Sequence, residues 1–171
     1  LAGGTLVSIN TRLTSAEIGY ILEQSGSTKV FYSPELRDQI PDTFSGAALL
    51  NVEDEFEDLL SQGGDAALPT SGFHEDETLA INYTSGTTGR PKGVMYHHRG
   101  AYLNALAMVL DHRLTADSVY LWTLPMFHCN GWTFAWGLAA VGAKSVCIPR
   151  IDPTDVWRRF DEGVTHFCAA P

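Results

Sequence analysis

The residues best suited to chemistry lie in one short segment, residues 83–93, with the sequence YTSGTTGRPKG. This segment holds four Ser or Thr hydroxyls, three glycines and one lysine. Glycines let backbone amides approach phosphate oxygens, hydroxyls donate hydrogen bonds or reach a metal ion, and lysine supplies positive charge. The composition therefore indicates a polyphosphate-binding loop. The alternative is a flexible hairpin tip, because Gly, Ser and Thr are also ordinary turn residues.

The segment differs from the two common glycine-rich phosphate motifs. Gly89 is followed by Arg-Pro-Lys-Gly, whereas the Walker loop needs Gly-Lys-Ser/Thr at the start of a helix. The chain also lacks Gly-x-Gly-x-x-Gly. Apolar, strand-like runs flank the segment on both sides, LAINYT before it and VMYHH after it. We therefore expect a strand–loop–strand clamp and not a loop that leads into a helix N-terminus.

Short apolar runs alternate with helical stretches along the chain, which is typical of an α/β domain. Thr14 and Glu17 form a capping box that predicts a helix start, and Gly26 is placed to end this helix. Ser33 followed by Pro34 predicts a second helix, with the serine as its cap. Further helices are predicted over residues 98–111, 132–141 and 153–161, and strands over residues 5–9, 28–32, 47–51, 79–84, 94–97, 119–124, 144–148 and 165–168.

The composition is that of a globular chain, with 44% hydrophobic residues, and no apolar run approaches the roughly 20 residues that span a membrane. The formal charge is −9. Nine acidic residues and no Lys or Arg lie between residues 51 and 77, which predicts a solvated surface excursion at about 52–77 with one short helix near 53–60. Because no basic patch occurs elsewhere, nucleic acid is not an expected partner.

The three cysteines, Cys129, Cys147 and Cys168, are an odd number, and each lies in an apolar run or beside a candidate loop. This pattern indicates free thiols in a reducing compartment, so we expect a cytoplasmic location. His97-His98 and the pair His166 and Cys168 lack a second ligand pair, so no zinc site is predicted.

Residues 83–93 resemble, residue for residue, the phosphate-binding signature of the adenylate-forming superfamily, which includes acyl-CoA synthetases, aryl-CoA ligases, peptide-synthetase adenylation domains and beetle luciferases. The run INTRL at residues 9–13 is similar to an early segment of this family. The run LPMFHCNGW at residues 124–132 is similar to its later Pro-x-Phe-His-x-x-Gly segment. The resemblance extends over essentially the whole chain. It implies an α/β fold that is part of the family's large N-terminal domain, with mixed sheets and flanking helices.

The resemblance implies that Mg-ATP and a carboxylic acid form an acyl-adenylate and pyrophosphate, and that the acyl group then passes to coenzyme A. Catalysis would consist of positioning and charge neutralisation. By position, Thr84 would lie near the magnesium ion and Lys92 would oppose the pyrophosphate charge; Arg90 receives no role because its position varies in the family. The residues that would cradle the ATP phosphates are Thr84, Ser85, Gly86, Thr87, Thr88, Gly89 and Lys92.

The resemblance also places His128 at the wall of the acyl pocket as the catalytic residue, with Phe127, Gly131 and Trp132 beside it. A histidine there can hydrogen-bond the carboxylate or stabilise developing acyl charge. A structural role for His128 and core packing for Trp132 are the alternatives. The sequence FHCNGW at residues 127–132 resembles the corresponding segment of fatty acyl-CoA synthetases, so we expect an aliphatic acid as the substrate.

The resemblance covers the central portion of one AMP-binding N-terminal domain, residues 1–171. The family's downstream Thr-Glu and Thr-Gly-Asp segments and its C-terminal lid domain have no counterpart in the chain. The chain also opens at Leu1 and stops at Pro171 in apolar sequence. We therefore expect a fragment of an acyl-CoA synthetase that has no ligase activity alone. The alternatives are an aryl-acid or amino-acid adenylating enzyme, or a truncated, non-catalytic nucleotide-binding module.

Overall fold

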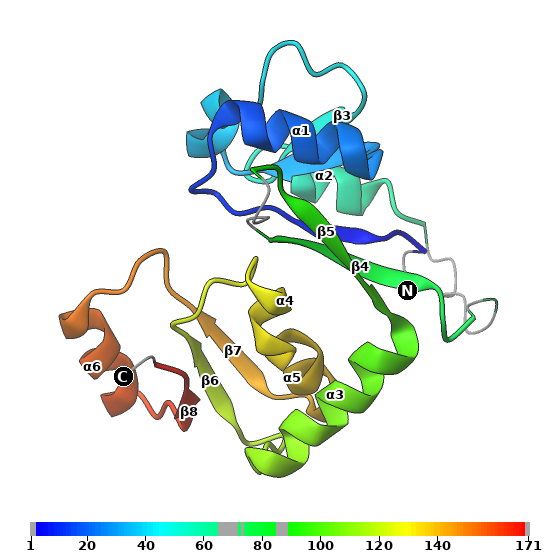
Figure 1. The fold of residues 1–171 in the computed structure, drawn as a ribbon. Coiled ribbons are helices and arrows are strands. Elements are labelled where there is room, and N and C mark those ends of the chain that lie inside the picture. The colour runs from blue at the N-terminus through cyan, green and yellow to red at the C-terminus, as the bar shows by residue number, and fades with distance from the viewer. Residues whose placement is uncertain (1–2, 65–71, 73, 85–88, 170–171) are drawn as a thin grey trace. The chain divides into compact units, whose positions relative to one another are not determined.

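The computed structural model describes residues 3–64, 72, 74–84 and 89–169 (Figure 1). The chain divides into two compact units, which are described separately. Unit 1 comprises Leu1–His74 and Leu79–Met95, and unit 2 comprises Glu75–Thr78 and Tyr96–Pro171. None of the helices in the described part of the chain combines the length and hydropathy that a membrane-spanning segment requires.

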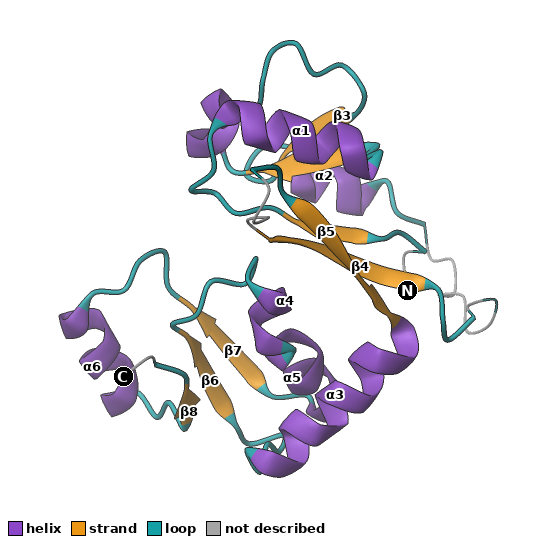
Figure 2. Cartoon of the chain, viewed as in Figure 1, coloured by secondary structure: helices purple, strands orange, loops and turns teal. Residues whose placement is uncertain are grey.

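Unit 1 contains two parallel strand pairings, one between strands distant in the sequence and one between strands joined through a single helical segment (Figure 2). β1 pairs with β4 in the register Leu6 to Ala80, and β5 is the next strand in the same sheet. β2 pairs with β3 in the register Lys29 to Ala48. The bounds are β1 Leu6–Ser8, α1 Ser15–Ser25, β2 Lys29–Tyr32, the 3-10 helix η1 Pro34–Gln39, β3 Ala48–Asn51, α2 Phe56–Ser61, β4 Thr78–Thr84 and β5 Lys92–His97.

Helix α1 forms as its sequence predicts. The Thr14 hydroxyl accepts a hydrogen bond from the Glu17 amide at 3.3 Å, and the Glu17 carboxylate accepts one from the Thr14 amide at 2.9 Å. Gly26, in the left-handed conformation, ends the helix. Ile18 and Leu22 are buried on one face of the helix and pack with Ile40 in the core of unit 1.

Unit 2 is a three-stranded parallel sheet in the order β7-β6-β8 with its helices around it. Its core contains Tyr120 and Trp122 of β6, and Phe134 stacks on Tyr120 with ring centroids 4.7 Å apart. The bounds are α3 His98–Asp111, β6 Val119–Trp122, α4 Cys129–Trp132, α5 Phe134–Val141, β7 Lys144–Cys147, α6 Pro153–Asp161 and β8 His166–Phe167.

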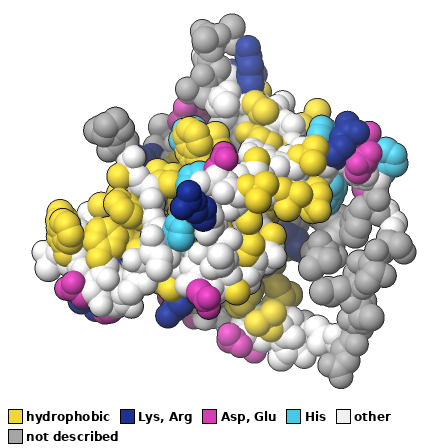
Figure 3. All heavy atoms as spheres, turned by 90° about the horizontal axis from the view of Figure 1, so that it is seen from below, with side chains coloured by type: hydrophobic (Ala, Val, Ile, Leu, Met, Phe, Trp, Pro, Cys, Tyr) yellow, Lys and Arg dark blue, Asp and Glu magenta, His cyan; other side chains and the backbone are white. Residues whose placement is uncertain are grey.

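Helix α3 is capped and ion-paired at its N-terminus and exposes large apolar side chains further along. His97 caps the helix, because its Nδ1 accepts a hydrogen bond from the Gly100 amide at 2.8 Å. Arg99 forms ion pairs with Glu75 and Asp76, which gives it a structural role. Further along α3, four large apolar side chains are exposed, namely Tyr102, Leu103, Leu106 and Leu110. Figure 3 shows hydrophobic side chains at the surface; such exposure is typical of surfaces that contact another polypeptide segment.

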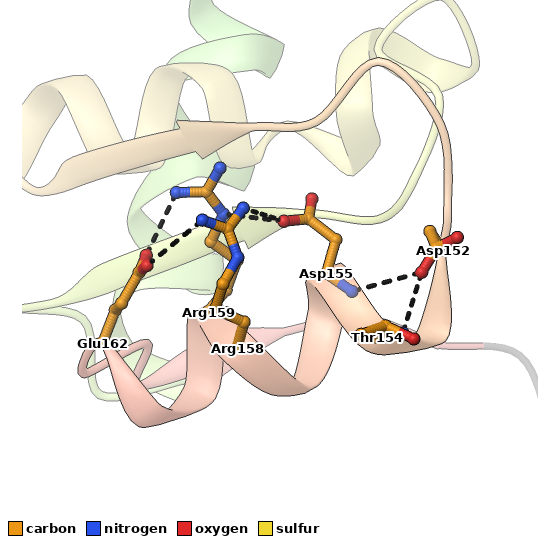
Figure 4. A network of polar contacts seen from close by, with 6 residues as sticks. All are labelled: Asp152, Thr154, Asp155, Arg158, Arg159 and Glu162. Atoms are coloured by element: carbon orange, nitrogen blue, oxygen red, sulfur yellow. Dashed lines mark hydrogen bonds and ion pairs between the residues drawn. The ribbon is translucent and has the colours of Figure 1, made fainter.

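Helix α6 is held by charged side chains on one face (Figure 4). Asp152 caps the helix, since its Oδ1 accepts hydrogen bonds from the amides of Thr154 and Asp155. Asp155 and Glu162 each pair with both Arg158 and Arg159. The hydrogen bond from Arg158 is the main reason that the pKa of Asp155 lies below its ordinary value. Trp157, also on α6, is 67% exposed and contacts Phe160.

Most predicted elements are present within two residues of their expected bounds, but four details differ. The segment from Ser33 forms a 3-10 helix, and the Ser33 side chain makes no capping hydrogen bond. The short acidic helix begins at Phe56, because a turn at residues 52–55 precedes it. The helix expected over 132–141 begins at Phe134, because Trp132 and Thr133 have positive φ angles. β5 begins at Lys92, two residues earlier than predicted.

Residues 129–133, which comprise α4 and Thr133, form a left-handed turn before α5. All five residues have φ between +50° and +64°, although only one of them is glycine. A Cβ on Gly131 would lie 2.3 Å from Cζ3 of the buried Trp122 ring, so the backbone lies directly against the indole. The left-handed conformation costs about 1–2 kcal/mol per non-glycine residue, so the surrounding packing must offset this cost.

Gly131→Ala should lower the free energy of unfolding by about 2–5 kcal/mol, because alanine pays for both the positive φ and the overlap with Trp122. Gly142→Ala is the matched control: Gly142 has φ +70° and no neighbour within 4 Å, so about 1–2 kcal/mol is expected. Chemical denaturation followed by tryptophan fluorescence measures both. Equal losses in the two variants would show that the Trp122 contact carries no energetic weight.

The capping box also makes a pH-dependent contribution. Hydrogen bonds from the backbone and side chain of Thr14 lower the pKa of Glu17 below its ordinary 4.5. The folded state therefore binds fewer protons than the unfolded state. The contribution of Glu17 to stability is complete above pH 4.5 and is lost as the pH falls through the folded-state pKa.

Glu17→Gln keeps an acceptor in the capping box but removes the titrating group. Between about pH 6 and about pH 3, this variant should lose less stability than the wild type. Glu23→Gln, an exposed position on the same helix, is the control and should follow the wild-type curve. Parallel curves for Glu17→Gln and the wild type would rule out this contribution.

Candidate functional site: a glycine-rich loop and a histidine turn

The glycine-rich loop joins β4 to β5, which are hydrogen-bonded neighbours in one sheet. This confirms the predicted strand–loop–strand arrangement. Thr84 is the last residue of β4, Lys92 is the first residue of β5, and both are exposed, as is Gly89 between them. The other residues predicted to bind phosphate lie outside the described residues: Ser85, Gly86, Thr87 and Thr88.

Both ends of the loop contact helix α1. On the β4 side, the Tyr83 hydroxyl donates a hydrogen bond to Gln24. On the β5 side, the Arg90 guanidinium carbon lies 5.5 Å from the centre of the Tyr20 ring, in a cation–π contact. Tyr20 and Gln24 are four residues apart and so share one side of α1. A single well-capped helix therefore holds both ends of the loop, and Arg90, to which no role was assigned, has a structural one.

The Tyr83 contact depends on a glycine in the neighbouring strand. A Cβ on Gly93 would lie 2.9 Å from Ile81 Cγ2 and 3.2 Å from Tyr83 Cζ, so a side chain there would displace the tyrosine ring. Burial, with a smaller contribution from Tyr20, raises the pKa of Tyr83, which keeps its hydroxyl protonated as a donor. Gly93 thus gives Tyr83 the space from which it reaches Gln24.

The side chains at the ends of the loop suit a nucleotide triphosphate. The Thr84 hydroxyl and the Lys92 ammonium are a donor and a cation, both exposed at the ends of strands. Within the described residues, no group of three or more His, Cys, Asp or Glu side chains could hold a metal ion by itself. Magnesium in such sites commonly takes much of its coordination from substrate phosphates and water, so these residues fit Mg-ATP better than free Mg²⁺.

The second group of predicted residues lies in unit 2, around the left-handed turn. His128 is exposed, Phe127 is half-buried and Gly131 is buried against Trp122. Trp132 is 55% exposed, and its ring centre lies 6.4 Å from that of His128 with the planes at 63°. The turn therefore brings His128 and Trp132 together at the surface, so core packing does not account for Trp132.

His128 has one further neighbour that the sequence gave no reason to select. Its Nδ1 lies 3.5 Å from the Cys129 thiol, within hydrogen-bonding range for sulfur. Burial raises the pKa of Tyr96, and its contact with Cys129 raises it further. Trp122 contacts the turn from the core, and no sequence pattern pointed to it. The one signal that could have indicated Cys129 is its position next to His128.

The comparison with protein families matches the whole chain. The family described as AMP-binding enzyme matches residues 1–171. Among curated proteins, 4-hydroxybutyrate–CoA ligase 2 of Metallosphaera sedula is 44% identical over 99% of this chain and 34% of its own length. The chain thus spans about a third of the length of this curated relative.

Solved structures agree with this match. The N-terminal domain of FACL13 from Mycobacterium tuberculosis superimposes with a TM-score of 0.84 and 31% identity, covering 96% of this chain and 43% of that one. O-succinylbenzoate coenzyme A synthetase from Bacillus subtilis, in complex with ATP and magnesium ion, gives a TM-score of 0.80 and 27% identity over 99% of this chain and 34% of its own. The expected α/β fold of an adenylate-forming N-terminal domain is confirmed, and the chain belongs to the AMP-binding enzyme family.

Proposed function

We propose that this chain is part of an AMP-forming acyl-CoA ligase. The enzyme activates a carboxylic acid with Mg-ATP to an acyl-adenylate and transfers the acyl group to coenzyme A. The observation that carries the proposal is the glycine-rich loop, whose two ends are held on α1 in a chain of the AMP-binding family. CoA ligase activity in the relatives' printed names supports it.

In this proposal, the loop positions the triphosphate, with Thr84, Ser85, Gly86, Thr87, Thr88, Gly89 and Lys92 around its phosphates. Bound magnesium supplies positive charge to the phosphate oxygens. Thr84 contributes a hydroxyl beside the metal, and Lys92 opposes the charge that builds on the departing pyrophosphate. Contacts of Tyr83 and Arg90 with α1 fix the points between which the loop runs.

The acyl pocket in this proposal is built from Phe127, His128, Gly131 and Trp132. His128 is the catalytic residue and donates a hydrogen bond to the reacting carboxyl group, while the Trp132 ring lines the path of the acyl chain. We assign an aliphatic acid of fatty type. The 44% identity to a ligase named for 4-hydroxybutyrate, itself aliphatic, supports this class.

The extent of the chain is part of the same proposal. Residues 1–171 form the central portion of one AMP-binding N-terminal domain, and the lid domain with its catalytic lysine belongs to the rest of a longer enzyme. The 34% coverage of the curated relative supports this view. We further propose a cytoplasmic location, supported by three cysteines that are all free in the structure.

A second function has a specific observation in its favour. The likeness to a synthetase named for o-succinylbenzoate favours an aryl acid as the substrate, with the same adenylation chemistry. An amino-acid adenylating enzyme and a non-catalytic nucleotide-binding module are the remaining alternatives.

Acid-dependent exchange of pyrophosphate into ATP by the whole enzyme tests the substrate class. Straight-chain aliphatic acids of increasing length and 4-hydroxybutyrate should support exchange, and addition of coenzyme A should then yield the thioester. O-succinylbenzoate and amino acids serve as comparison substrates and should support little exchange. Exchange with only the aryl or amino acids would contradict the aliphatic assignment, and no exchange with any acid would favour the non-catalytic module. The 171 residues alone should show no exchange.

Lys92→Ala in the whole enzyme should lower the rate of pyrophosphate exchange about 10- to 100-fold, because a charge-assisted contact to phosphate is lost. The KM for the acid should change by less than about twofold, since Lys92 does not contact the acid in this proposal. Lys144→Ala is the matched control: it removes an exposed lysine at the start of β7 that has no role in this proposal, and exchange should be unchanged. Unchanged kinetics in Lys92→Ala would remove Lys92 from the site.

A further inference from the structure

The thiol of Cys129 is the hydrogen-bonding partner of Nδ1 in the His128 ring, at 3.5 Å. Within the described part of the chain, Nε2 of the same ring makes no hydrogen bond, and the His128 side chain is exposed. The two nitrogens therefore differ in their surroundings. In a neutral imidazole, one nitrogen carries the hydrogen and the other accepts, and the partner of Nδ1 decides which.

The backbone holds the thiol in this place. Cys129 is the first residue of the left-handed turn, with φ +50°, and the turn is packed against Trp122 at Gly131. His128 also contributes to the turn, because its carbonyl accepts a hydrogen bond from the Gly131 amide at 3.0 Å. The packed backbone of the turn therefore holds the adjacent His128 and Cys129 side chains in contact.

The direction of the hydrogen bond follows from the chemistry of the two groups. A thiol has one hydrogen to donate and its sulfur is a weak acceptor, whereas an unprotonated imidazole nitrogen is a good acceptor. Across the 3.5 Å between them, the favourable arrangement directs the thiol hydrogen to Nδ1 of His128.

We propose that Cys129 is a positioning residue that donates to Nδ1 of His128 and holds the ring in the tautomer with hydrogen on Nε2. This inference rests on the proposed function, in which His128 acts on the acid. The exposed Nε2–H is then the hydrogen that the carboxylate oxygen accepts during adenylation. In the opposite tautomer, Nε2 would present a lone pair to a negatively charged carboxylate, which is unfavourable.

The tautomer can be measured directly in the whole enzyme labelled with ¹⁵N-histidine. Two-bond ¹H–¹⁵N correlations distinguish a protonated from an unprotonated ring nitrogen, and His128→Gln assigns the signal. The wild type should show Nε2–H. Cys129→Ala should lose this preference and show both tautomers, whereas Cys129→Ser, which keeps a donor, should retain Nε2–H. Cys147→Ala is the matched control, because Cys147 is exposed on β7, and it should leave the signal unchanged.

Kinetics give a second readout. Cys129→Ala should lower kcat for acid-dependent pyrophosphate exchange about fivefold, which corresponds to the loss of one weak hydrogen bond. The KM for ATP should remain within about twofold of the wild-type value, and Cys129→Ser should restore kcat to within about twofold. A merely structural role would lower the thermal stability of Cys129→Ala without this separation of kcat from KM.

Retention of a pure Nε2–H signal in Cys129→Ala would overturn the proposal, as would a loss of kcat that Cys129→Ser fails to restore. If the wild-type enzyme shows no exchange with any acid but the tautomer still follows the residue at position 129, the proposed function fails and the control of the ring by Cys129 stands. The two inferences can therefore fail separately.

Discussion

The approach of the Gly131 backbone to the Trp122 ring is the contact on which the second unit depends. Trp122 is only 6% exposed and belongs to the central strand of a parallel sheet, so its ring is fixed by the core. No side chain fits between the ring and the backbone at Gly131, and the chain passes the ring as a left-handed turn. The turn ends where Phe134 starts α5 and stacks on Tyr120. Core packing thus offsets an unfavourable backbone path, which in turn presents His128 and Trp132 at the surface.

Unit 1 also presents candidate residues at its surface, and it holds them in a different way. Its described candidate side chains, Thr84 and Lys92, lie at the exposed ends of two strands. Order at the ends comes from α1, whose capping box and buried face fix Tyr20 and Gln24. Tyr83 and Arg90 then tie the two strand ends to this helix. In both units, the exposed candidate residues lie on or beside loops that contact well-packed elements.

The sequence predicted what local patterns determine. Alternating apolar runs located the eight strands that the described residues form, and the Thr14–Glu17 pair located the start of α1, because capping depends on residues three apart. The start of α5 was predicted two residues too early, since the apolar pattern includes Trp132 and carries no sign of the positive φ angles at Trp132 and Thr133. Cys129 and Arg90 were passed over as site components for a related reason. The partner of Arg90, Tyr20, is distant in the sequence, and no spacing rule connects them. No sequence pattern predicts that the Cys129 side chain turns toward the ring of the adjacent His128.

The register of β1 against β4 has a consequence for synthesis on the ribosome. Leu6 pairs with Ala80, so the two strands are more than 70 residues apart in the chain. At about 5–20 residues per second, the nascent chain carries β1 without its partner for about 4–15 s. During that interval a short apolar strand offers its open edge to other chains and to chaperones. Translation therefore sets the earliest time at which this sheet, and with it the loop at the end of β4, can form.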